Sequence, residues 1–292
     1  MHGDRVTLTD RLGGAISDTA RHDAVSDTAG DAVRYETDGP VGRLTLNRPG
    51  QRNSFTDELL RSLLRAVERA VSDDTVRVLL LTGSGSAFSV GGDLNEFAAG
   101  KFRPEGVPIT ASVERLRRFM HASELLRRSD KVTIAAVNGA CAGAGFSIAA
   151  ACDIRVASTD AVFRTSFLDA GLSGDFGGTW LLTRLLGEAR ARELYLLNDK
   201  ITAERAQNIG LVSWTEAPER FGVRVSVLAA SLAGKAPIAL QAIKRNFNDL
   251  PIDFADACDL EARRQIECAY TADAVEAARA FLQKRQPVYV GG

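Results

Sequence analysis

The chain has 292 residues, of which 45% are hydrophobic, so it can bury the core of one large domain or of a domain with an appendage. Its 36 basic and 37 acidic residues leave a formal net charge of −1, so there is no basic field that would attract nucleic acid. Of its histidines, His2 and His22 lie in the N-terminal stretch, so a triad or a histidine-rich metal site would have to use His121. We therefore expect a catalytic acid or base to be a carboxylate.

The N-terminal stretch, residues 1–31, is rich in Asp, Thr, Ala, Gly and Ser and has no periodicity. We expect a disordered extension. It lacks the apolar segment of a signal peptide, and its aspartates argue against a mitochondrial transit sequence. The sequence has no apolar run long enough to span a membrane. These features predict a cytoplasmic protein that is not embedded in a membrane.

The four cysteines show no paired C-x-x-C spacing, which argues against a zinc site, and we expect no bound metal. They lie in apolar or helical surroundings, and we expect all of them to be small core residues in a reducing compartment: Cys141, Cys152, Cys258 and Cys268.

Strands and helices alternate through the first two thirds of the chain. We predict strands at 32–36, 41–46, 76–82, 132–137 and 154–157, and helices at 57–71, 111–129 and 145–152, with a loop over 95–110. Helices then dominate, at 177–186, 188–197, 202–209, 217–234, 236–249, 254–270 and 273–285. This order predicts an α/β core over 32–225 and a helical region over 226–292.

Two glycine-rich turns follow predicted strands. Asn138 to Gly145 separates the strand 132–137 from the apolar helix 145–152, and Ser86 to Leu94 follows the strand 76–82. Free N–H groups at such a helix start favour an anion or an oxyanion that develops on a carbonyl. The alternative is that the small residues serve close packing only.

Five motifs in order carry a resemblance to a known family: LTLNRPGQRNSF (44–55), GSAFSVGGDL (85–94), AAVNGACAGAGFSIAAACDIRVAS (135–158), GLSGDFGGTWLLTRLLG (171–187) and AQNIGLV (206–212). Together the motifs resemble the enoyl-CoA hydratase/isomerase (crotonase) superfamily over roughly residues 32–286. The resemblance implies a spiral core of ββα turns and a C-terminal helical region that packs across a homotrimer or a dimer of trimers. It also implies acyl-CoA substrates, no cofactor besides the coenzyme A of the substrate, and an oxyanion hole made by the N–H groups of Gly92 and Ala144.

The coenzyme A contacts are also inferred from the resemblance. Gln51, Arg52 and Ser54 match the family turn that meets the adenosine portion, and Phe281 and Lys284 resemble the tail that reaches coenzyme A from a neighbouring subunit. The alternative for each is a solvated surface residue. Lys244, in the predicted helix 236–249, is interpreted as a surface residue.

The chain departs from the family hydratases at two positions. These enzymes carry one glutamate that activates water and a second that handles the proton at Cα, and these would fall at Ser147 and Phe167. Neither side chain is a carboxylate, which argues against ordinary hydration, and Phe167 makes that wall of the pocket drier.

Asp175 is the remaining well-placed acid. Its place in GL-x-x-D-x-GG is similar to the base of dienoyl-CoA isomerases and of ring-epoxyphenylacetyl-CoA/enoyl-CoA isomerases, and the latter are closest in motif. We expect Phe167, Phe176 and Phe146 to desolvate it and raise its pKa. The alternative is an N-cap for the helix 177–186.

Three other acids are weaker candidates for the catalytic base. Asp169 is expected at an exposed loop position, Asp93 as a helix N-cap and Asp153 in a turn.

Three functions remain open from the sequence. The favoured one is an enoyl-CoA isomerase with Asp175 as proton shuttle. The second is a related thioester enzyme: a hydratase, hydrolase or dehalogenase. The third is a non-catalytic acyl-CoA binding protein.

Overall fold

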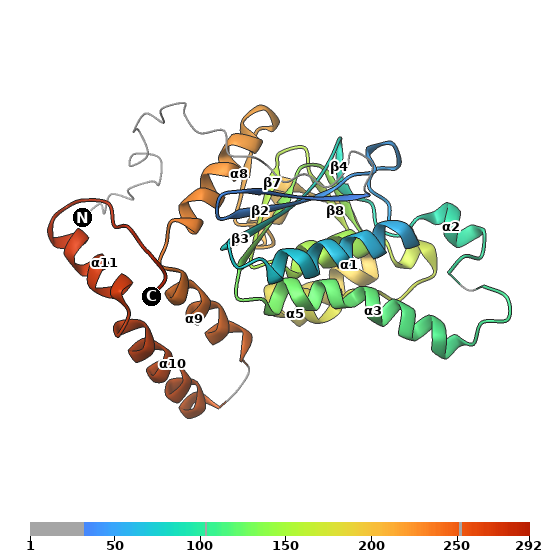
Figure 1. Ribbon diagram of the computed structural model, residues 1–292. Coiled ribbons are helices and arrows are strands. Elements are labelled where there is room, and N and C mark those ends of the chain that lie inside the picture. The colour runs from blue at the N-terminus through green and yellow to red at the C-terminus, as the bar shows by residue number, and fades with distance from the viewer. Residues whose placement is uncertain (1–31, 103, 251–252) are drawn as a thin grey trace.

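The computed structural model describes residues 32–102, 104–250 and 253–292 (Figure 1). The predicted extension 1–31 lies outside the described residues. Within them, no single helix is long and apolar enough to cross a membrane. Two helices pass that test of length and composition as a pair, Pro218–Ala233 and Pro237–Asn248, but they are bent by 101° at the break between them.

The main sheet has six strands in the order β1-β2-β3-β5-β7-β10. They are β1 (Val33–Asp38), β2 (Val41–Leu46), β3 (Val78–Gly83), β5 (Val132–Val137), β7 (Ile154–Ser158) and β10 (Trp214–Glu216). β1 and β2 form an antiparallel hairpin, and every later pairing is parallel. All residues of β5 are buried, as its continuous apolar sequence requires for a central parallel strand covered on both faces.

A second sheet of four short strands lies beside the first, in the order β4-β6-β8-β9. These strands, β4 (Ala87–Ser89), β6 (Ala140–Ala142), β8 (Val162–Arg164) and β9 (Ile201–Thr202), were not predicted. β4, β6 and β8 each follow a strand of the main sheet, and β4 and β6 lead directly into helices α2 (Leu94–Ala98) and α4 (Ala144–Ala151). The ββα repeat implied by the resemblance is therefore present.

Helices cover both faces of the main sheet. In Figure 1, α1 (Asp57–Ser72), α3 (Ile109–Arg128) and α5 (Gly178–Leu186) lie on one side and α8 (Pro218–Ala233) on the other. The larger core cluster joins α1, α4 and α5 to one face, and the smaller one packs Phe221 and Val225 of α8 on Val78 and Ile134. α4 is buried over its whole length, which its uniformly apolar sequence allows.

The remaining helices are α6 (Glu188–Leu197), α7 (Ala203–Asn208), α9 (Pro237–Asn248), α10 (Phe254–Ala269) and α11 (Ala272–Leu282). α9 to α11 project from the core at the end opposite α2 (Figure 1). α10 has no buried residue in this single chain.

Lys244 of α9 is a correction to the sequence analysis, because it is buried rather than at the surface. Its ammonium donates to the carbonyl oxygens of Leu126 and Lys131 at 3.1 and 2.7 Å and pairs with Asp153 at 2.8 Å. Asp153 also accepts from the backbone N–H of Thr133 at 2.8 Å, so it does more than hold a turn. These contacts fasten α9 to the core.

Two further predictions need correction. Cys141 and Cys152 are buried, but Cys258 is exposed and Cys268 half-buried, because α10 has no buried face. The predicted loop 95–110 begins with the short helix α2, which Asp93 caps.

His121 lies on α3, as predicted, 3.2 Å from Glu124. The described residues contain no cluster of His, Cys, Asp or Glu suited to a metal ion.

Candidate active site

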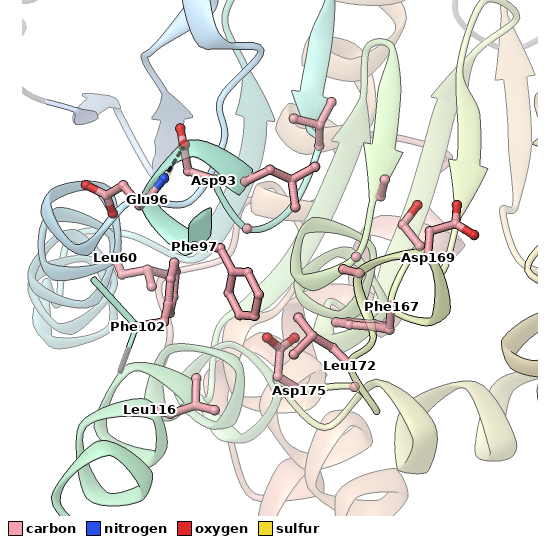
Figure 2. Close-up of a pocket in the computed structure, with 18 of the residues that line it drawn as sticks. Leu60, Asp93, Glu96, Phe97, Phe102, Leu116, Phe167, Asp169, Leu172 and Asp175 are labelled. Atoms are coloured by element: carbon pink, nitrogen blue, oxygen red, sulfur yellow. Dashed lines mark hydrogen bonds between the residues drawn. The ribbon is translucent and has the colours of Figure 1, made fainter. Parts of the chain in front are cut away.

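A large cavity, about 1410 Å³ in volume, opens between α2, α3 and the segment that precedes α5. Figure 2 shows apolar side chains from all three walls around it, among them Leu60, Phe97, Phe102, Leu116, Phe167 and Leu172. Gly92, Ala142 and Gly143 of the two glycine-rich turns line its floor. The cavity therefore joins an apolar space to exposed backbone.

The two glycine-rich turns are in direct backbone contact, because β4 and β6 pair in parallel. Gly91 has φ +82°, and a Cβ there would stand 2.8 Å from the carbonyl oxygen of Ala142 and 3.3 Å from the nitrogen of Ala144. A residue with a side chain would push the turns apart as well as being strained. Their glycines are required for this approach and not merely tolerated.

The N–H groups of Gly92 and Ala144 have no protein acceptor among the described residues, whereas the N–H group immediately before each of them is used. Gly91 N–H donates to Ser89 Oγ at 3.1 Å and Gly143 N–H donates to the Arg164 carbonyl at 3.1 Å. Ala144 is the first residue of α4, where the N–H groups carry the positive end of the helix dipole. Two free donors on touching turns suit an oxyanion.

Asp175 also lines the cavity and has no ion-pair partner among the described residues. Figure 2 shows its carboxyl group turned into the cavity, beside Leu172 and below Phe97. Oδ1 is buried and, within the described part of the chain, lacks a hydrogen-bond partner. Burial raises the pKa of Asp175 to about 7.

The capping role considered for Asp175 is wrong. α5 begins at Gly178 with Gly177 as its N-cap, and no side chain caps it. Asp175 contributes only its carbonyl oxygen, which accepts from the N–H of Gly178 at 3.0 Å. Phe176 has φ +49° and Gly177 has φ +74°, and this left-handed pair places the Phe176 ring in the core while Asp175 faces the cavity.

Of the three aromatic rings expected around Asp175, Phe167 lines the cavity. Phe176 packs on Phe55 and Phe146 on Phe163 in the core, at centroid separations of 6.0 and 5.5 Å. Residues that the sequence analysis missed complete the walls: Leu60, Phe97, Phe102, Leu116 and Leu172. They come from separate elements, and no motif joins them.

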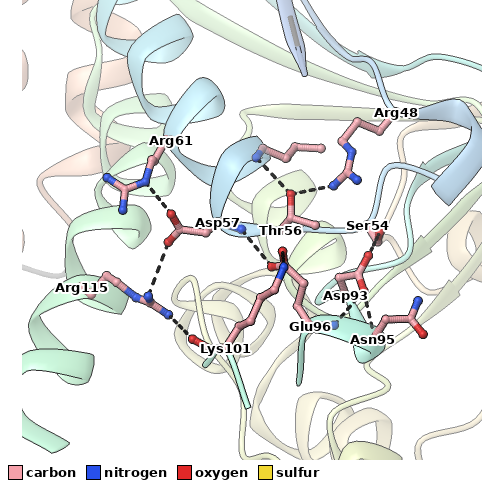
Figure 3. A network of polar contacts seen from close by, with 11 residues as sticks. Arg48, Ser54, Thr56, Asp57, Arg61, Asp93, Asn95, Glu96, Lys101 and Arg115 are labelled. Carbon is pink, nitrogen blue, oxygen red and sulfur yellow. Dashed lines mark hydrogen bonds and ion pairs between the residues drawn. The ribbon is translucent and has the colours of Figure 1, made fainter. Parts of the chain in front are cut away.

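Two other acids that line the cavity, Asp93 and Asp169, have polar partners. Asp93 caps α2 through Asn95 and Glu96 N–H groups at 3.0 and 3.2 Å, as predicted, and Ser54 Oγ donates to it at 2.7 Å (Figure 3). The hydrogen bond from Ser54 is the largest cause holding the pKa of Asp93 below its usual value. Asp169 is exposed, as predicted, and pairs with Arg164 at 2.8 Å.

The wall formed by α2 and the residues after it is tied to α1 and α3 by polar contacts (Figure 3). Glu96 accepts from the N–H of Asp57 at 3.2 Å and pairs with Lys101 at 3.0 Å. Arg115 of α3 donates to the Lys101 carbonyl at 3.2 Å and lies 3.7 Å from Asp57. Arg115 therefore links the wall to both helices.

The residues expected at coenzyme A are not brought together within one chain. Gln51 and Arg52 are exposed at the 3-10 helix η2 (Pro49–Gln51), and Arg52 lines the cavity. Ser54 is buried and bonded to Asp93, so its hydroxyl is not free for adenosine. Phe281 and Lys284 are exposed at α11, on the side of the molecule away from α2 (Figure 1).

Comparisons with known proteins show the family of this chain. The family described as enoyl-CoA hydratase/isomerase matches residues 36–292. A 1,2-epoxyphenylacetyl-CoA isomerase from Escherichia coli (strain K12) is 38% identical over 86% of this chain and 95% of its own. A protein from Rhodobacter capsulatus named probable enoyl-CoA hydratase is 37% identical over 89% of this chain and 98% of its own.

A solved structure adds a bound ligand to the comparison. A protein from Thermobifida fusca YX, described as a putative enoyl-CoA hydratase and solved in complex with acetoacetyl-CoA, shares 32% identity with a TM-score of 0.74. The match covers 81% of this chain and 94% of that one.

Proposed function

Because this chain belongs to the enoyl-CoA hydratase/isomerase family, we propose that it moves the double bond of an enoyl-CoA, with Asp175 as the proton shuttle. The family and its acyl-CoA chemistry are common to the relatives, which are named both as isomerases and as hydratases. What favours isomerisation is one observation: of the carboxylates that line the cavity among the described residues, only Asp175 has a buried oxygen and no side-chain partner, since the unpaired Asp160 is exposed, and its pKa of about 7 suits a base.

The proposed reaction needs no other reactant. The Asp175 carboxylate removes a proton from Cα of a 3-enoyl-CoA, and the electron pair of the broken C–H bond moves onto the thioester oxygen through a dienolate. The N–H groups of Gly92 and Ala144 hold that oxygen, each such donor contributing about 2.7–4 kcal/mol in comparable enzymes. Asp175 then returns the same proton to Cγ, which leaves the double bond between Cα and Cβ.

A hydratase is the second candidate, because relatives of similar identity carry that name. Hydration adds a water and is helped by a second acid or base that handles it. The positions where the resemblance expects glutamates are Ser147 and Phe167, both buried. The other carboxylates that line the cavity and were considered, Asp93 and Asp169, are bonded to Ser54 and Arg164.

The test is Asp175→Asn, assayed with 3-enoyl-, 2-enoyl- and aromatic acyl-CoAs in deuterated water and read by mass spectrometry. We expect wild type to gain deuterium and move the double bond without adding water. Since an amide cannot accept the proton, Asp175→Asn should lose isomerisation by at least about 100-fold, in line with general acid–base contributions, while acyl-CoA affinity stays near wild type. Retained isomerisation in the variant would reject Asp175 as the shuttle.

The matched control is Asp169→Asn, which alters an exposed, ion-paired acid that lines the same cavity. Its turnover should stay within about twofold of wild type, since exposed ion pairs contribute little. Wild-type protein that adds the mass of water to a 2-enoyl-CoA would support the hydratase instead. Saturable binding with no chemical change would indicate an acyl-CoA binding protein.

A further inference from the structure

Tyr195 of α6 fills the space behind the loop that carries Asp175. Its ring is stacked parallel to that of Phe167, with centroids 5.9 Å apart and an interplanar angle of 1°. A Cβ on Gly174 would stand 3.2 Å from Tyr195 Cε1, and one on Gly178 would stand 2.4 Å from the Tyr195 hydroxyl. The phenol is therefore packed against the backbone on both sides of Asp175.

The Tyr195 hydroxyl also meets Ser147 of α4. The same Cβ on Gly178 would lie 2.3 Å from Ser147 Oγ, so the two hydroxyls share one small space. Burial raises the pKa of Tyr195 to about 12, with a side-chain hydrogen bond to Ser147 opposing and the charge of Asp175 adding to the shift. The phenol is thus neutral at physiological pH and adds no negative charge beside Asp175.

This packing limits the space in which a water molecule could lie beside Asp175. A buried water needs room and two or more polar partners, and here the hydroxyls of Tyr195 and Ser147 already occupy the polar space behind the loop. Oδ1 of Asp175 is buried and has no protein partner among the described residues, so its protonation state is sensitive to any water admitted beside it. Among the side chains of α6, the Tyr195 phenol is the one that fills this space.

Building on the proposed function, we propose that Tyr195 is a positioning residue that excludes water from the buried side of Asp175. It thereby directs the site toward proton transfer and away from addition of water.

Other charged groups on the cavity walls do not account for the state of Asp175. Six of them are paired with one another: Asp169 with Arg164 at 2.8 Å, Glu96 with Lys101 at 3.0 Å, and Arg115 with Asp57 at 3.7 Å. The other charged groups that line the cavity are either exposed (Arg52, Asp160 and Lys200) or, for Asp93, bonded to Ser54. Burial is the cause of the raised pKa of Asp175. A change that lets water reach this carboxyl should therefore act on its titration directly.

The experiment compares Tyr195→Ala, which opens the space, with Tyr195→Phe, which keeps the ring and its stacking on Phe167. The titration of Asp175 is followed by NMR of enriched aspartate carboxyl carbons, with the signal assigned by its loss in Asp175→Asn. We expect Tyr195→Ala to lower the pKa of Asp175 by about 1 unit or more, since hydration favours the charged form, and Tyr195→Phe to leave it within a few tenths. Hydrated product, traced with heavy-oxygen water, should appear in Tyr195→Ala alone.

Tyr35→Ala is the control for general loosening, because Tyr35 is a buried tyrosine of β1 that bonds Asp73 at 3.0 Å and does not line the cavity. An equal shift in Tyr35→Ala, or an unchanged titration in Tyr195→Ala, would overturn the proposal. If Tyr195→Ala does not fold, Tyr195→Leu takes the same measurements. If wild type isomerises no acyl-CoA, the proposed function fails, yet the titration still decides the role of Tyr195.

Discussion

Asp175 shows how a single residue is made reactive by what surrounds it rather than by a partner. The left-handed conformations of Phe176 and Gly177 turn its side chain toward the cavity. A non-glycine residue held there costs of order 1 kcal/mol or more, and the buried Phe176 ring offsets that cost by packing on Phe55. The Asp175 side chain does not cap α5, and its carboxyl group stays unpaired among the described residues.

This burial predicts a pH-dependent stability. The folded pKa of Asp175 is about 7 against an ordinary 3.8, so the folded protein binds the proton more tightly than the unfolded chain does. That contribution to stability is fully present below about pH 3.8 and is lost as the pH rises to about 7. The side chain of Asp175→Asn does not ionise. The free energy of unfolding of this variant should therefore increase relative to that of wild type as the pH rises from about 3.8 to about 7.

Urea unfolding of both proteins at several pH values between about 4 and 8 measures this difference, which spans the pKa range given for Asp175. Isomerisation by wild type should rise with pH through about 7, because the base must be ionised. A constant stability difference across the window would contradict the burial of a charge at Asp175.

The oxyanion donors allow a second test at the residue scale. Ala144→Pro removes one N–H at the first position of α4, where proline is compatible with the helix. Turnover should fall by about 100- to 1,000-fold, the loss typical of one oxyanion donor, while the coenzyme A end still binds. Ala272→Pro, at the first position of α11, is a matched control at an exposed site. Near-normal turnover in folded Ala144→Pro would place the hole elsewhere.

At the scale of elements, the short helix α2 and the residues after it form a cavity wall held by polar contacts rather than by a core. Leu94 is 67% exposed and Phe97 is 39% exposed, so these apolar side chains of the wall are not buried in the core and are available to contact a ligand. Its attachment to α1 and α3 passes through Glu96, Lys101 and Arg115. Elements with few buried contacts open at low free-energy cost.

Arg115→Gln should therefore loosen the wall without unfolding the protein. We expect KM for an acyl-CoA to rise several-fold, while the free energy of unfolding changes by less than about 1 kcal/mol, as for other exposed ion pairs. Arg61→Gln is the control, because Arg61 also pairs with Asp57 but is not bonded to Lys101. Equal KM values in the two variants would show that the Lys101 contact is not what holds the wall.

For the whole molecule, the exposed apolar side chains gather on the C-terminal helices. Phe254 and Phe281 are each 83% exposed and Tyr270 is 87% exposed in the single chain. Monomers seldom leave such large side chains in water together, and a stable interface of standard size buries about 1,600 Å² in total. These helices are the natural surface for the proposed homotrimer.

Sedimentation at working concentration should give a trimer or a dimer of trimers. Phe281→Glu should shift the protein toward smaller species and weaken acyl-CoA binding, because the proposed coenzyme A contact comes from a neighbouring chain. Val223→Glu, at an exposed position of α8, is a control outside α10 and α11. A clean monomer for wild type would reject the assembly.

The sequence by itself determined the elements whose pattern is local and strong. The strand 132–137 and the helix 188–197 match β5 and α6 at both ends, and the cap at Asp93 was predicted from its place after the first glycine-rich turn, although α2 itself was not predicted. Glycines marked the two turns, and at Gly91 and Gly145 only a residue without Cβ permits the contact between them. The motifs around them also identified the family.

The tertiary structure decided what depends on residues far apart in the chain. Strands of three residues, such as β4 and β6, are too short to show alternation, and they form because neighbouring turns supply their partners. Lys244 looked like a surface lysine until the carbonyls of Leu126 and Lys131 were placed beside it. The sequence predicted that desolvation raises the pKa of Asp175, but it did not show that Tyr195 packs beside the loop that carries Asp175, because that packing joins residues of α4, α5 and α6 that lie far apart in the chain.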